Sequence, residues 1–370
     1  MCPLILLTCL LLSTLTQAIL LPAPPGSANV HITHFPLTDT SRVDPFAPCC
    51  DLPRRLMVTL YQPATCEQTE TITYIPPTSA AAIKKVFSPY LPNISLDNFE
   101  LQVCPEAAVE NDLPLLFFTP GYWAPRVVYA VMLQWVASLG FNILAIDHPY
   151  DGAIVEYPDG SYVEYANVTI PDEILTLLAP RVADVSTVLN AVTNNTRWQE
   201  LGVPVLSTER MAVFGHSLGG ATAVGALLAE PRLMAACNID GGLWGDEITT
   251  DNDRPFLLIH AENHPASDTS WDENWPYQKG PKWHLEISGT RHNALTDFSI
   301  LSTLLGTNRT DPAVEAFIGT IDSVRLLKIL REYIAAFFHE ILEGTDEPLL
   351  SGPSMRFPEV SFRNMSSGGG

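Results

Sequence analysis

The chain has 370 residues, of which 46% are hydrophobic, so it is long enough for one large α/β domain or two smaller ones. Its formal net charge is −21, from 20 Lys and Arg against 41 Asp and Glu. This acidity argues against nucleic-acid binding, which needs clustered Lys and Arg, and against electrostatic docking on anionic membranes. We interpret it as the acidity of a soluble secreted protein.

The N-terminus has the features of a secretory signal peptide, although no Lys or Arg precedes its apolar run. The run from Leu4 to Leu12 is too short to span a membrane. Thr16-Gln17-Ala18 resembles a cleavage site, so we expect residues 1–18 to be removed. Five Asn-x-Ser/Thr sequons fit an extracellular, glycosylated surface. They are Asn93, Asn167, Asn194, Asn308 and Asn364.

Five cysteines follow the predicted cleavage site: Cys49, Cys50, Cys66, Cys104 and Cys237. An oxidising compartment favours one or two disulfides. Cys66 and Cys104 bracket an insertion between strands, so we expect them to pair first. Cys237 lies in an apolar strand and is expected to be a buried free thiol. No Cys or His spacing suggests zinc, and the sequence predicts neither a metal nor a cofactor.

Alternating and turn-rich patterns dominate the first third of the chain. After a Pro-rich leader at 19–29, the alternation predicts strands at Val30–Pro36 and Leu56–Tyr61, joined by a turn-rich connection at 39–45. Residues 62–113 are predicted to be irregular, apart from one helix near Ala80–Phe87.

Apolar runs further on predict central strands that are covered on both faces. They are Leu113–Thr119, Phe141–Ile146, Met211–Phe214, Leu233–Ile239, Phe256–His260 and, as the last strand, Trp283–Ile287. The predicted helices are Val127–Leu139 ending at Gly140, 172–198 interrupted at Pro180, Ala221–Glu230, and Val324–Leu342 with Ser323 as N-cap and Gly344 beyond its C-terminus. A polar loop with Gly152 and Gly160 precedes the second of these helices.

This alternation predicts an α/β fold with a mostly parallel central sheet and helices on both faces. We see no linker that divides the chain. We therefore expect one domain over residues 19–365 and a disordered tail at 366–370.

A nucleophile turn is the clearest motif. Gly215-His216-Ser217-Leu218-Gly219 lies between the predicted strand Met211–Phe214 and a predicted helix, which is the context of a serine nucleophile in α/β-hydrolases. A strained turn of this kind needs glycine at Gly215 and Gly219, where a Cβ would be too close to its neighbours. The helix N-terminus and the Leu218 N–H suit a developing oxyanion.

A serine nucleophile needs a histidine base and an acid, which follow it in the order acid, then histidine. His292 follows the last predicted strand and is the preferred base, with His264 as the second choice. The remaining histidines have predicted structural roles: His216, whose side chain must point away from that of Ser217, His260, His284 and His339.

Two acids end predicted strands, Asp240 and Glu262, and the pattern alone does not choose between them. The second oxyanion donor is expected after the strand Leu113–Thr119, where Gly121 lets the backbone approach and Tyr122 offers its N–H.

Three segments then resemble the secreted and plasma-type platelet-activating factor acetylhydrolases. These are calcium-independent phospholipase A2 enzymes of the α/β-hydrolase fold. The segments are Gly215–Thr222, Asn238–Trp244 and Gly289–Phe298, and the resemblance covers most of the chain from about residue 30 to about residue 360.

The resemblance implies Asp240 as the acid and backbone oxyanion donors at Tyr122 and Leu218. It also implies a phospholipid substrate with a short or oxidised sn-2 acyl chain. One departure is Pro120-Gly121, where animal members carry His-Gly. The loop that contains Trp271, Trp275 and Trp283 matches nothing in the family pattern.

The sequence thus predicts a secreted serine esterase that uses Ser217, His292 and Asp240. A general short-chain carboxylesterase, lipase or polyester hydrolase is the alternative within the enzyme class, and a catalytically silent binding module is the alternative outside it. Trp123 or the residues around Leu175–Leu178 are candidates for transient contact with a lipid surface, with burial in the core as the other interpretation.

Overall fold

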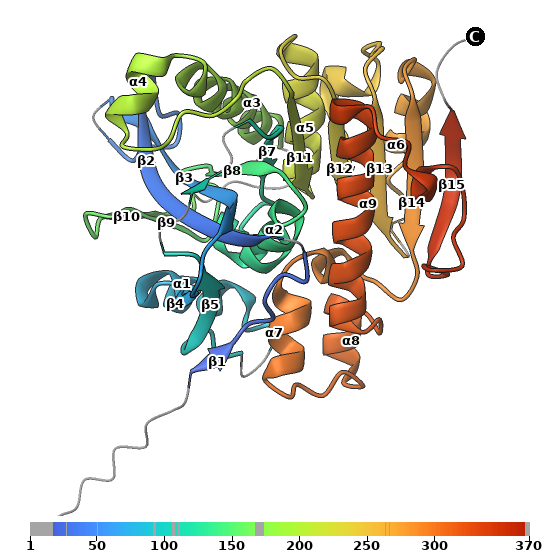
Figure 1. Ribbon diagram of the computed structural model, residues 1–370, viewed down its shortest axis with the longest axis horizontal. Coiled ribbons are helices and arrows are strands. Elements are labelled where there is room, and N and C mark those ends of the chain that lie inside the picture. Colours follow the sequence, from blue (N-terminus) through green and yellow to red (C-terminus); the bar gives the residue numbers. More distant parts are fainter. Residues whose placement is uncertain are drawn as a thin grey trace, which may run out of the picture.

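A ten-stranded mixed sheet runs through the part of the chain that the structure describes (Figure 1). The structure is a computed structural model, and it describes residues 18–26, 28–49, 51–91, 94–105, 108–109, 112–166, 174–262, 264–265 and 267–366. In spatial order the strands are β15 (Val360–Ser366), β14 (Lys282–Ile287), β13 (Phe256–Ala261), β12 (Ala236–Ile239), β11 (Met211–His216), β7 (Leu115–Thr119), β8 (Asn142–Asp147), β3 (Pro53–Thr65) and β2 (Asn29–Val43), and β6 (Ala108–Val109) also pairs with β3.

The centre of this sheet is parallel and its margins are antiparallel. The strands from β14 through β13, β12, β11 and β7 to β8 pair in parallel. The pairs β8–β3, β3–β2 and β14–β15 are antiparallel. The expected α/β class with a mostly parallel central sheet is therefore confirmed.

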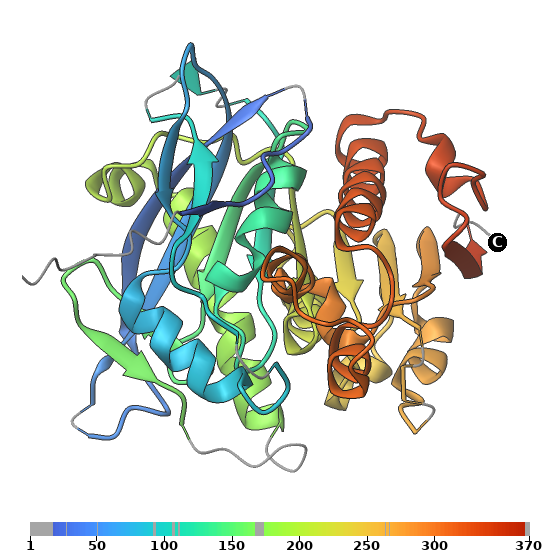
Figure 2. The same cartoon turned by 90° about the horizontal axis from the view of Figure 1, so that it is seen from below.

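Helices cover both faces of the sheet, because the central strands are apolar on both sides (Figure 2). On β7, Phe118 packs in the cluster with α2 (Ala130–Ala137) and α9 (Ser323–Glu343), and Phe117 packs in the cluster with α3 (Ile174–Val192) and α5 (Leu218–Ala229). The two clusters form the core and leave the carboxyl ends of the parallel strands to carry the loops.

Other helices are short. They are α1 (Pro77–Phe87), α4 (Asn195–Glu200), α6 (Ser270–Asn274), α7 (Phe298–Leu304) and α8 (Pro312–Ile318), with 3₁₀ turns η1 (Arg126–Tyr129), η2 (Gly245–Ile248), η3 (Trp275–Tyr277), η4 (His292–Leu295) and η5 (Pro348–Leu350).

The segment between β3 and β7 is more regular than predicted. It holds α1 and two strands of a small sheet, β4 (Glu70–Thr73) and β5 (Phe99–Val103), to which β1 (Ile19–Leu20) also pairs. The prediction of an irregular region was wrong because these strands are short and pair with distant partners. Cys66 and Cys104 form a disulfide in this region, as expected.

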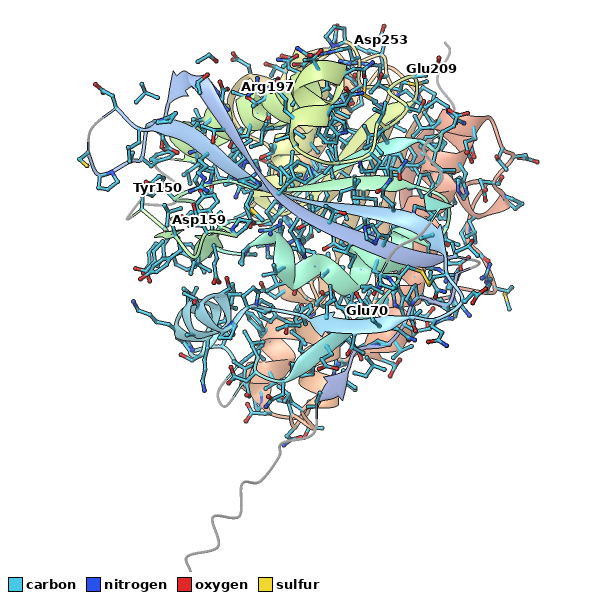
Figure 3. The ribbon with its side chains drawn as sticks, turned by 60° about the vertical axis from the view of Figure 1, so that its left-hand side comes forward. Glu70, Tyr150, Asp159, Arg197, Glu209 and Asp253 are labelled. Atoms are coloured by element: carbon cyan, nitrogen blue, oxygen red, sulfur yellow. A yellow bond between two sulfur atoms is a disulfide. The ribbon has the colours of Figure 1, made fainter. Side chains whose placement is uncertain are left out.

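The predicted polar loop after β8 folds into a hairpin, β9 (Ile154–Glu156) and β10 (Tyr162–Glu164). Figure 3 labels Tyr150 and Asp159 beside it, and Glu70 on β4. Asp159 at the hairpin tip accepts a hydrogen bond from Arg55 of β3 at 2.8 Å. The hairpin turn therefore has a side-chain contact to the main sheet.

β2 continues to Val43, through most of the segment 39–45 that was predicted to be a turn-rich connection. Asp39 accepts hydrogen bonds from Ser41 and from Thr187 of α3, and Arg42 donates to Asp184 of α3 at 2.7 Å. These tertiary contacts outweigh the turn preference of the residues. The chain reverses only between Val43 and Pro53.

α3 passes through Pro180 without the interruption that the sequence predicted. Buried ion pairs lie on the C-terminal side of Pro180, where Arg181 pairs with Asp151 and Asp184 pairs with Arg54. α3 is long and apolar enough to cross a membrane by length and composition. Its buried charges and its packing against α5 place it in the core instead.

The C-terminal part adds a strand that the sequence did not predict. β15 pairs with β14, so Trp283–Ile287 is not the last strand. Its side chains are mostly exposed, and only Val360 is buried, which explains why it lacks an apolar run. At the start of α9, Asp322 rather than Ser323 is the cap and accepts from the Arg325 N–H at 2.8 Å. Gly344 ends this helix with φ +69°, as expected.

Several predicted features lie outside the described residues: signal-peptide residues 1–17, the sequons at Asn93 and Asn167, Cys50, and tail residues 367–370. The remaining tail residue, Ser366, belongs to β15. The sequons at Asn194, Asn308 and Asn364 are on exposed residues. Cys237 is a buried free cysteine, as predicted, and Cys49 is an exposed one.

The disulfide is expected to stabilise the fold by constraining the unfolded chain. The variant Cys66→Ser/Cys104→Ser opens a link that spans 38 residues of sequence, and its free energy of unfolding should fall by about 3–4 kcal/mol. Urea denaturation measures this change. Cys49→Ser is the control and should keep the wild-type midpoint, and equal midpoints for all three proteins would contradict the expectation.

Candidate active site

The site begins at the turn between β11 and α5. Ser217 follows the last residue of β11 and has φ +58°, and Leu218 is the first residue of α5. A Cβ on Gly215 would lie 2.2 Å from the Gly219 carbonyl oxygen, and one on Gly219 would lie 2.0 Å from the Thr119 oxygen. Only glycine fits at both positions, which is why the Gly-x-Ser-x-Gly pattern accompanies this strained serine.

Three side chains from distant parts of the sequence form a hydrogen-bonded chain. The Ser217 Oγ lies 2.8 Å from His292 Nε2, and His292 Nδ1 lies 2.5 Å from Asp240 Oδ2. Asp240 follows β12 and His292 begins η4 after β14, so each lies beyond the carboxyl end of a parallel strand. The Asp240 side chain is 1% exposed and that of His292 is 43% exposed.

Asp240 is held as an ionised carboxylate. Burial alone would raise the pKa of its carboxyl, but hydrogen bonds from His264 and His292 outweigh burial and hold the pKa below its usual range. The backbone N–H of Ala261 also donates to Asp240 Oδ1, at 3.0 Å. An ionised Asp240 accepts the Nδ1–H of His292, which leaves Nε2 free of a proton on the side that faces Ser217.

Glu262, the other acid that the pattern allowed, contacts the backbone before His292 instead. Its Oε2 accepts from the Gly289 N–H at 2.6 Å, and its own N–H donates to the Thr290 hydroxyl at 3.1 Å. Of the two candidate acids, Asp240 is therefore the one that contacts His292. Glu262 supports the loop that carries this histidine.

Arg181 fixes the loop that carries Tyr122. Its guanidinium is buried, pairs with Asp151, and donates to the carbonyls of Pro120 at 2.6 Å and Gly121 at 3.3 Å. In a trans peptide the N–H of Tyr122 points opposite to the carbonyl of Gly121, so Arg181 directs that N–H away from itself. Leu218 offers the first N–H of α5, which has no intrahelical acceptor.

His216 connects this loop to the loop that carries His292. The Gly121 N–H donates to the Tyr129 hydroxyl at 3.1 Å, and that hydroxyl lies 2.8 Å from His216 Nδ1. His216 Nε2 lies 3.0 Å from the His292 carbonyl oxygen, which can only accept, so Nε2 carries the proton and Nδ1 accepts from Tyr129. Burial and the nearby His292 lower the pKa of His216 to about 3, which keeps this ring neutral.

The sequence did not reveal this bridge. His216 was expected to pack or to support the helix, and Tyr129 was not singled out at all. The sequence pattern does indicate that the His216 side chain points to the side of the strand opposite Ser217, where a contact with another loop is possible.

Two cavities meet at Ser217. The larger has a volume of about 530 Å³, and its lining includes Leu218, Trp244, His264 and Arg291. The smaller has a volume of about 230 Å³, and half of its lining residues are Phe, Tyr or Trp. Its aromatic lining residues are Phe87, Tyr90, Tyr122, Trp123, Tyr129 and Phe317.

Residues proposed for lipid contact differ in exposure. Leu175 is 53% exposed, whereas Leu177 and Leu178 are buried. Trp123 is partly buried and stacks on Tyr122, with ring centroids 5.1 Å apart. Leu175 and Trp123 therefore keep accessible apolar surface, and the other two leucines belong to the core.

The tryptophans at 271, 275 and 283 do not form one cluster. Trp271 packs against His264 with ring centroids 3.8 Å apart, and its Nε1 donates to the Gly241 carbonyl at 2.7 Å. Trp283 belongs to the core cluster on the opposite face of the sheet. Within the described residues, no group of three or more His, Cys, Asp or Glu side chains could hold a metal ion.

The fold and the arrangement of Ser217, His292 and Asp240 beyond the parallel strands are those of the α/β-hydrolases. Comparisons with known proteins narrow this class. The family model "Platelet-activating factor acetylhydrolase, isoform II" matches residues 172–347. A probable 1-alkyl-2-acetylglycerophosphocholine esterase from Arthroderma benhamiae is 30% identical, and the match covers 95% of each chain.

The chain belongs to the platelet-activating factor acetylhydrolase family, as its motifs suggested, and it is a carboxylic ester hydrolase. The platelet-activating factor acetylhydrolase of Gallus gallus is 24% identical over 51% of this chain and 54% of the relative. Among solved structures, a ferulic acid esterase from Streptomyces cinnamoneus superposes with a TM-score of 0.80 at 28% identity, covering 93% of this chain and 99% of that one.

The Tyr129 hydroxyl provides a test of the bridge. Tyr129→Phe leaves the buried Gly121 N–H and His216 Nδ1 without their partner, so we expect a loss of about 1–3 kcal/mol in the free energy of unfolding. We also expect kcat for ester hydrolysis to fall because two loops of the site lose their connection.

The matched control is Tyr333→Phe. The buried Tyr333 hydroxyl has no hydrogen-bond partner among the described residues, so its removal should cost less stability and leave kcat near the wild-type value. Denaturant unfolding and steady-state kinetics measure both effects. Equal losses in the two variants would contradict the bridge.

Proposed function

We propose that Ser217 is the nucleophile, His292 the general base and Asp240 the acid that orients it. The observation that carries this proposal is the continuous hydrogen-bonded chain from Ser217 Oγ through His292 to Asp240, at the junction of two cavities. A serine hydroxyl is a weak nucleophile, and a histidine held in one tautomer by a buried carboxylate activates it.

The proposed reaction has two halves. Ser217 Oγ attacks the ester carbonyl carbon while His292 Nε2 takes its proton. The backbone N–H groups of Tyr122 and Leu218 stabilise the tetrahedral oxyanion, and loss of one such donor typically costs about 3–4 kcal/mol. The intermediate collapses to an acyl-enzyme when His292 returns the proton to the leaving alcohol. A water molecule, deprotonated by His292, then releases the acid and regenerates Ser217.

We propose that the substrate is a phospholipid with a short acyl ester at the sn-2 position. The name of the Arthroderma benhamiae relative supports an acetyl ester of a glycerophosphocholine, and the name of the Gallus gallus relative supports release of an acetyl group from platelet-activating factor. The unequal cavities also fit a small acyl group and a larger alcohol, because the two parts of an ester bond must lie on either side of Ser217.

A second candidate substrate is an ester of an aromatic acid. The smaller cavity has an aromatic wall, which includes Tyr90 and Phe317 stacked with centroids 5.3 Å apart. A planar acyl group would pack well against such a wall. The printed name of the Streptomyces cinnamoneus structure also supports an ester of this type.

The proposed setting is outside the cell, after removal of residues 1–18, with residues 19–365 forming one domain. The disulfide supports an oxidising compartment, and the exposed sequons at Asn194, Asn308 and Asn364 support glycosylation there. Exposed Leu175 and partly buried Trp123 support transient contact with a lipid surface.

The assignment of the acid can be tested by a pair of variants. Asp240→Asn should lower kcat/KM by about 10³-fold or more, because an asparagine favours the wrong tautomer of His292. Glu262→Gln should lower kcat/KM by less than about tenfold, because its amide oxygen still accepts the Gly289 N–H. Steady-state hydrolysis of p-nitrophenyl acetate measures both, and the reverse ranking would overturn the assignment.

The substrate proposal can be tested with three esters: an sn-2 acetyl glycerophosphocholine, methyl ferulate and p-nitrophenyl acetate. We expect the phospholipid to have the highest kcat/KM, by about tenfold or more, because its larger alcohol binds the larger cavity. Preference for methyl ferulate would favour the second candidate, and cleavage of p-nitrophenyl acetate alone would indicate a general short-chain esterase.

Ser217→Ala is the control for this panel and should abolish turnover of all three esters while the protein stays folded. A fluorophosphonate probe should label the wild-type protein at Ser217 and fail to label the variant. A folded wild-type protein that neither turns over an ester nor reacts with the probe would be the silent binding module.

A further inference from the structure

A second histidine contacts Asp240 on the side away from His292. His264 Nδ1 lies 3.2 Å from Asp240 Oδ1, and His292 binds the other oxygen of the same carboxylate. The second nitrogen of His264, Nε2, lies 3.0 Å from Asp268 Oδ2. The chain of contacts at Ser217 therefore extends past Asp240, through His264, to a second acid.

This geometry requires His264 to be charged. Ionised carboxylates only accept hydrogen bonds, so both ring nitrogens of His264 must carry a proton when they face Asp240 and Asp268. Burial would lower the pKa of His264, but the hydrogen bonds to these two carboxylates raise it to about 9. The Trp271 ring, 3.8 Å away between centroids, adds a favourable cation–π contact.

The other titratable groups around His264 are neutral, paired with other residues or directed elsewhere, so His264 is the positive charge that contacts Asp240. His260 and His284, from β13 and β14, are kept neutral because burial lowers their pKa, that of His284 to about 3. Glu286 of β14 is 3.7 Å from His260 and pairs with Arg363 of β15 at 2.5 Å. Glu262, Arg291 and His292 line the larger cavity beside it, and Asp272 lies on α6 and is exposed.

We propose that His264 is a positioning residue: a fixed cation that, with the Ala261 N–H, holds the second oxygen of Asp240, and whose charge sets how far the rate extends to low pH. The proposal rests on the proposed function, since it takes His292 as the base. A proton taken up beside Asp240 adds a second positive charge at one buried carboxylate. The like charge on His264 disfavours that uptake, so the rate is maintained to lower pH.

The role differs from that of a second catalytic base. His264 cannot accept a proton while both its nitrogens donate to carboxylates. It acts on the reaction only through Asp240. Its expected effect is therefore on the pH dependence of the rate, and not on the identity of the nucleophile or base.

The test is the acid limb of kcat/KM against pH, measured with p-nitrophenyl acetate. His264→Asn removes the charge, so the limb should move to higher pH by about one unit. His264→Lys keeps a positive charge beside Asp240 and should leave the limb within about 0.3 units of wild type. Asp272→Asn removes an exposed carboxylate of α6 that is not bonded to His264, and it controls for bulk charge by leaving the limb in place.

Two outcomes would overturn the proposal. One is an unchanged limb in folded His264→Asn, which would mean that His264 only packs in its loop. The other is an equal displacement in His264→Lys, which would show that charge is not the cause. Thermal unfolding of each variant separates either outcome from loss of fold.

NMR of ring-¹⁵N-labelled histidines provides a readout that does not depend on activity. The His264 resonances, assigned by their loss in His264→Asn, should report a doubly protonated ring up to about pH 8. A ring that loses its proton near pH 6.5, the ordinary histidine value, would overturn the proposal. If Ser217→Ala retains activity, the proposed function fails, whereas the NMR result on His264 still stands or falls separately.

Discussion

Close backbone approach around Ser217 is the constraint on which the site depends. A Cβ on Gly220 would lie 2.0 Å from the Asn238 Oδ1, and one on Gly241 would lie 2.1 Å from the Ser217 carbonyl oxygen. Asn238 in turn accepts the Gly241 N–H and donates to its carbonyl. The start of α5 and the loop after β12 can therefore pack directly on each other, which brings Asp240 to the same edge of the sheet as Ser217.

Buried polar contacts then set the positions of the loops that meet there. Arg181 holds the loop of Tyr122 from the side of α3, and His216 joins it to the backbone of His292 through Tyr129. Because these groups are buried and paired, any movement of one loop would leave a buried donor or acceptor without its partner. The site is thus organised before a substrate binds, as the proposed electrostatic stabilisation of an oxyanion requires.

The sequence predicted the parts of this structure that depend on local pattern. The central strands, the serine turn and the position of His292 follow from apolar runs, glycine spacing and chain order. Long-range contacts could not be read in that way. β2 stays extended past Asp39 because it contacts α3. α3 stays continuous at Pro180 because the residues after Pro180 are packed in the core. β15 is an edge strand with mostly exposed side chains, so its sequence has only a weak apolar pattern. The choice between Asp240 and Glu262 needed the family resemblance, because both end neighbouring strands.

The position of β15 has a consequence for biosynthesis. β14 carries the loop of His292, and its outer edge pairs with β15, which follows it by more than seventy residues of chain. A ribosome makes every other strand of the main sheet first, so β14 passes through a period with an unpaired edge of the kind that recruits other chains. Folding of this half of the sheet can be completed only after residues 360–366 have been synthesised, which makes chaperone protection of the nascent chain valuable at that stage.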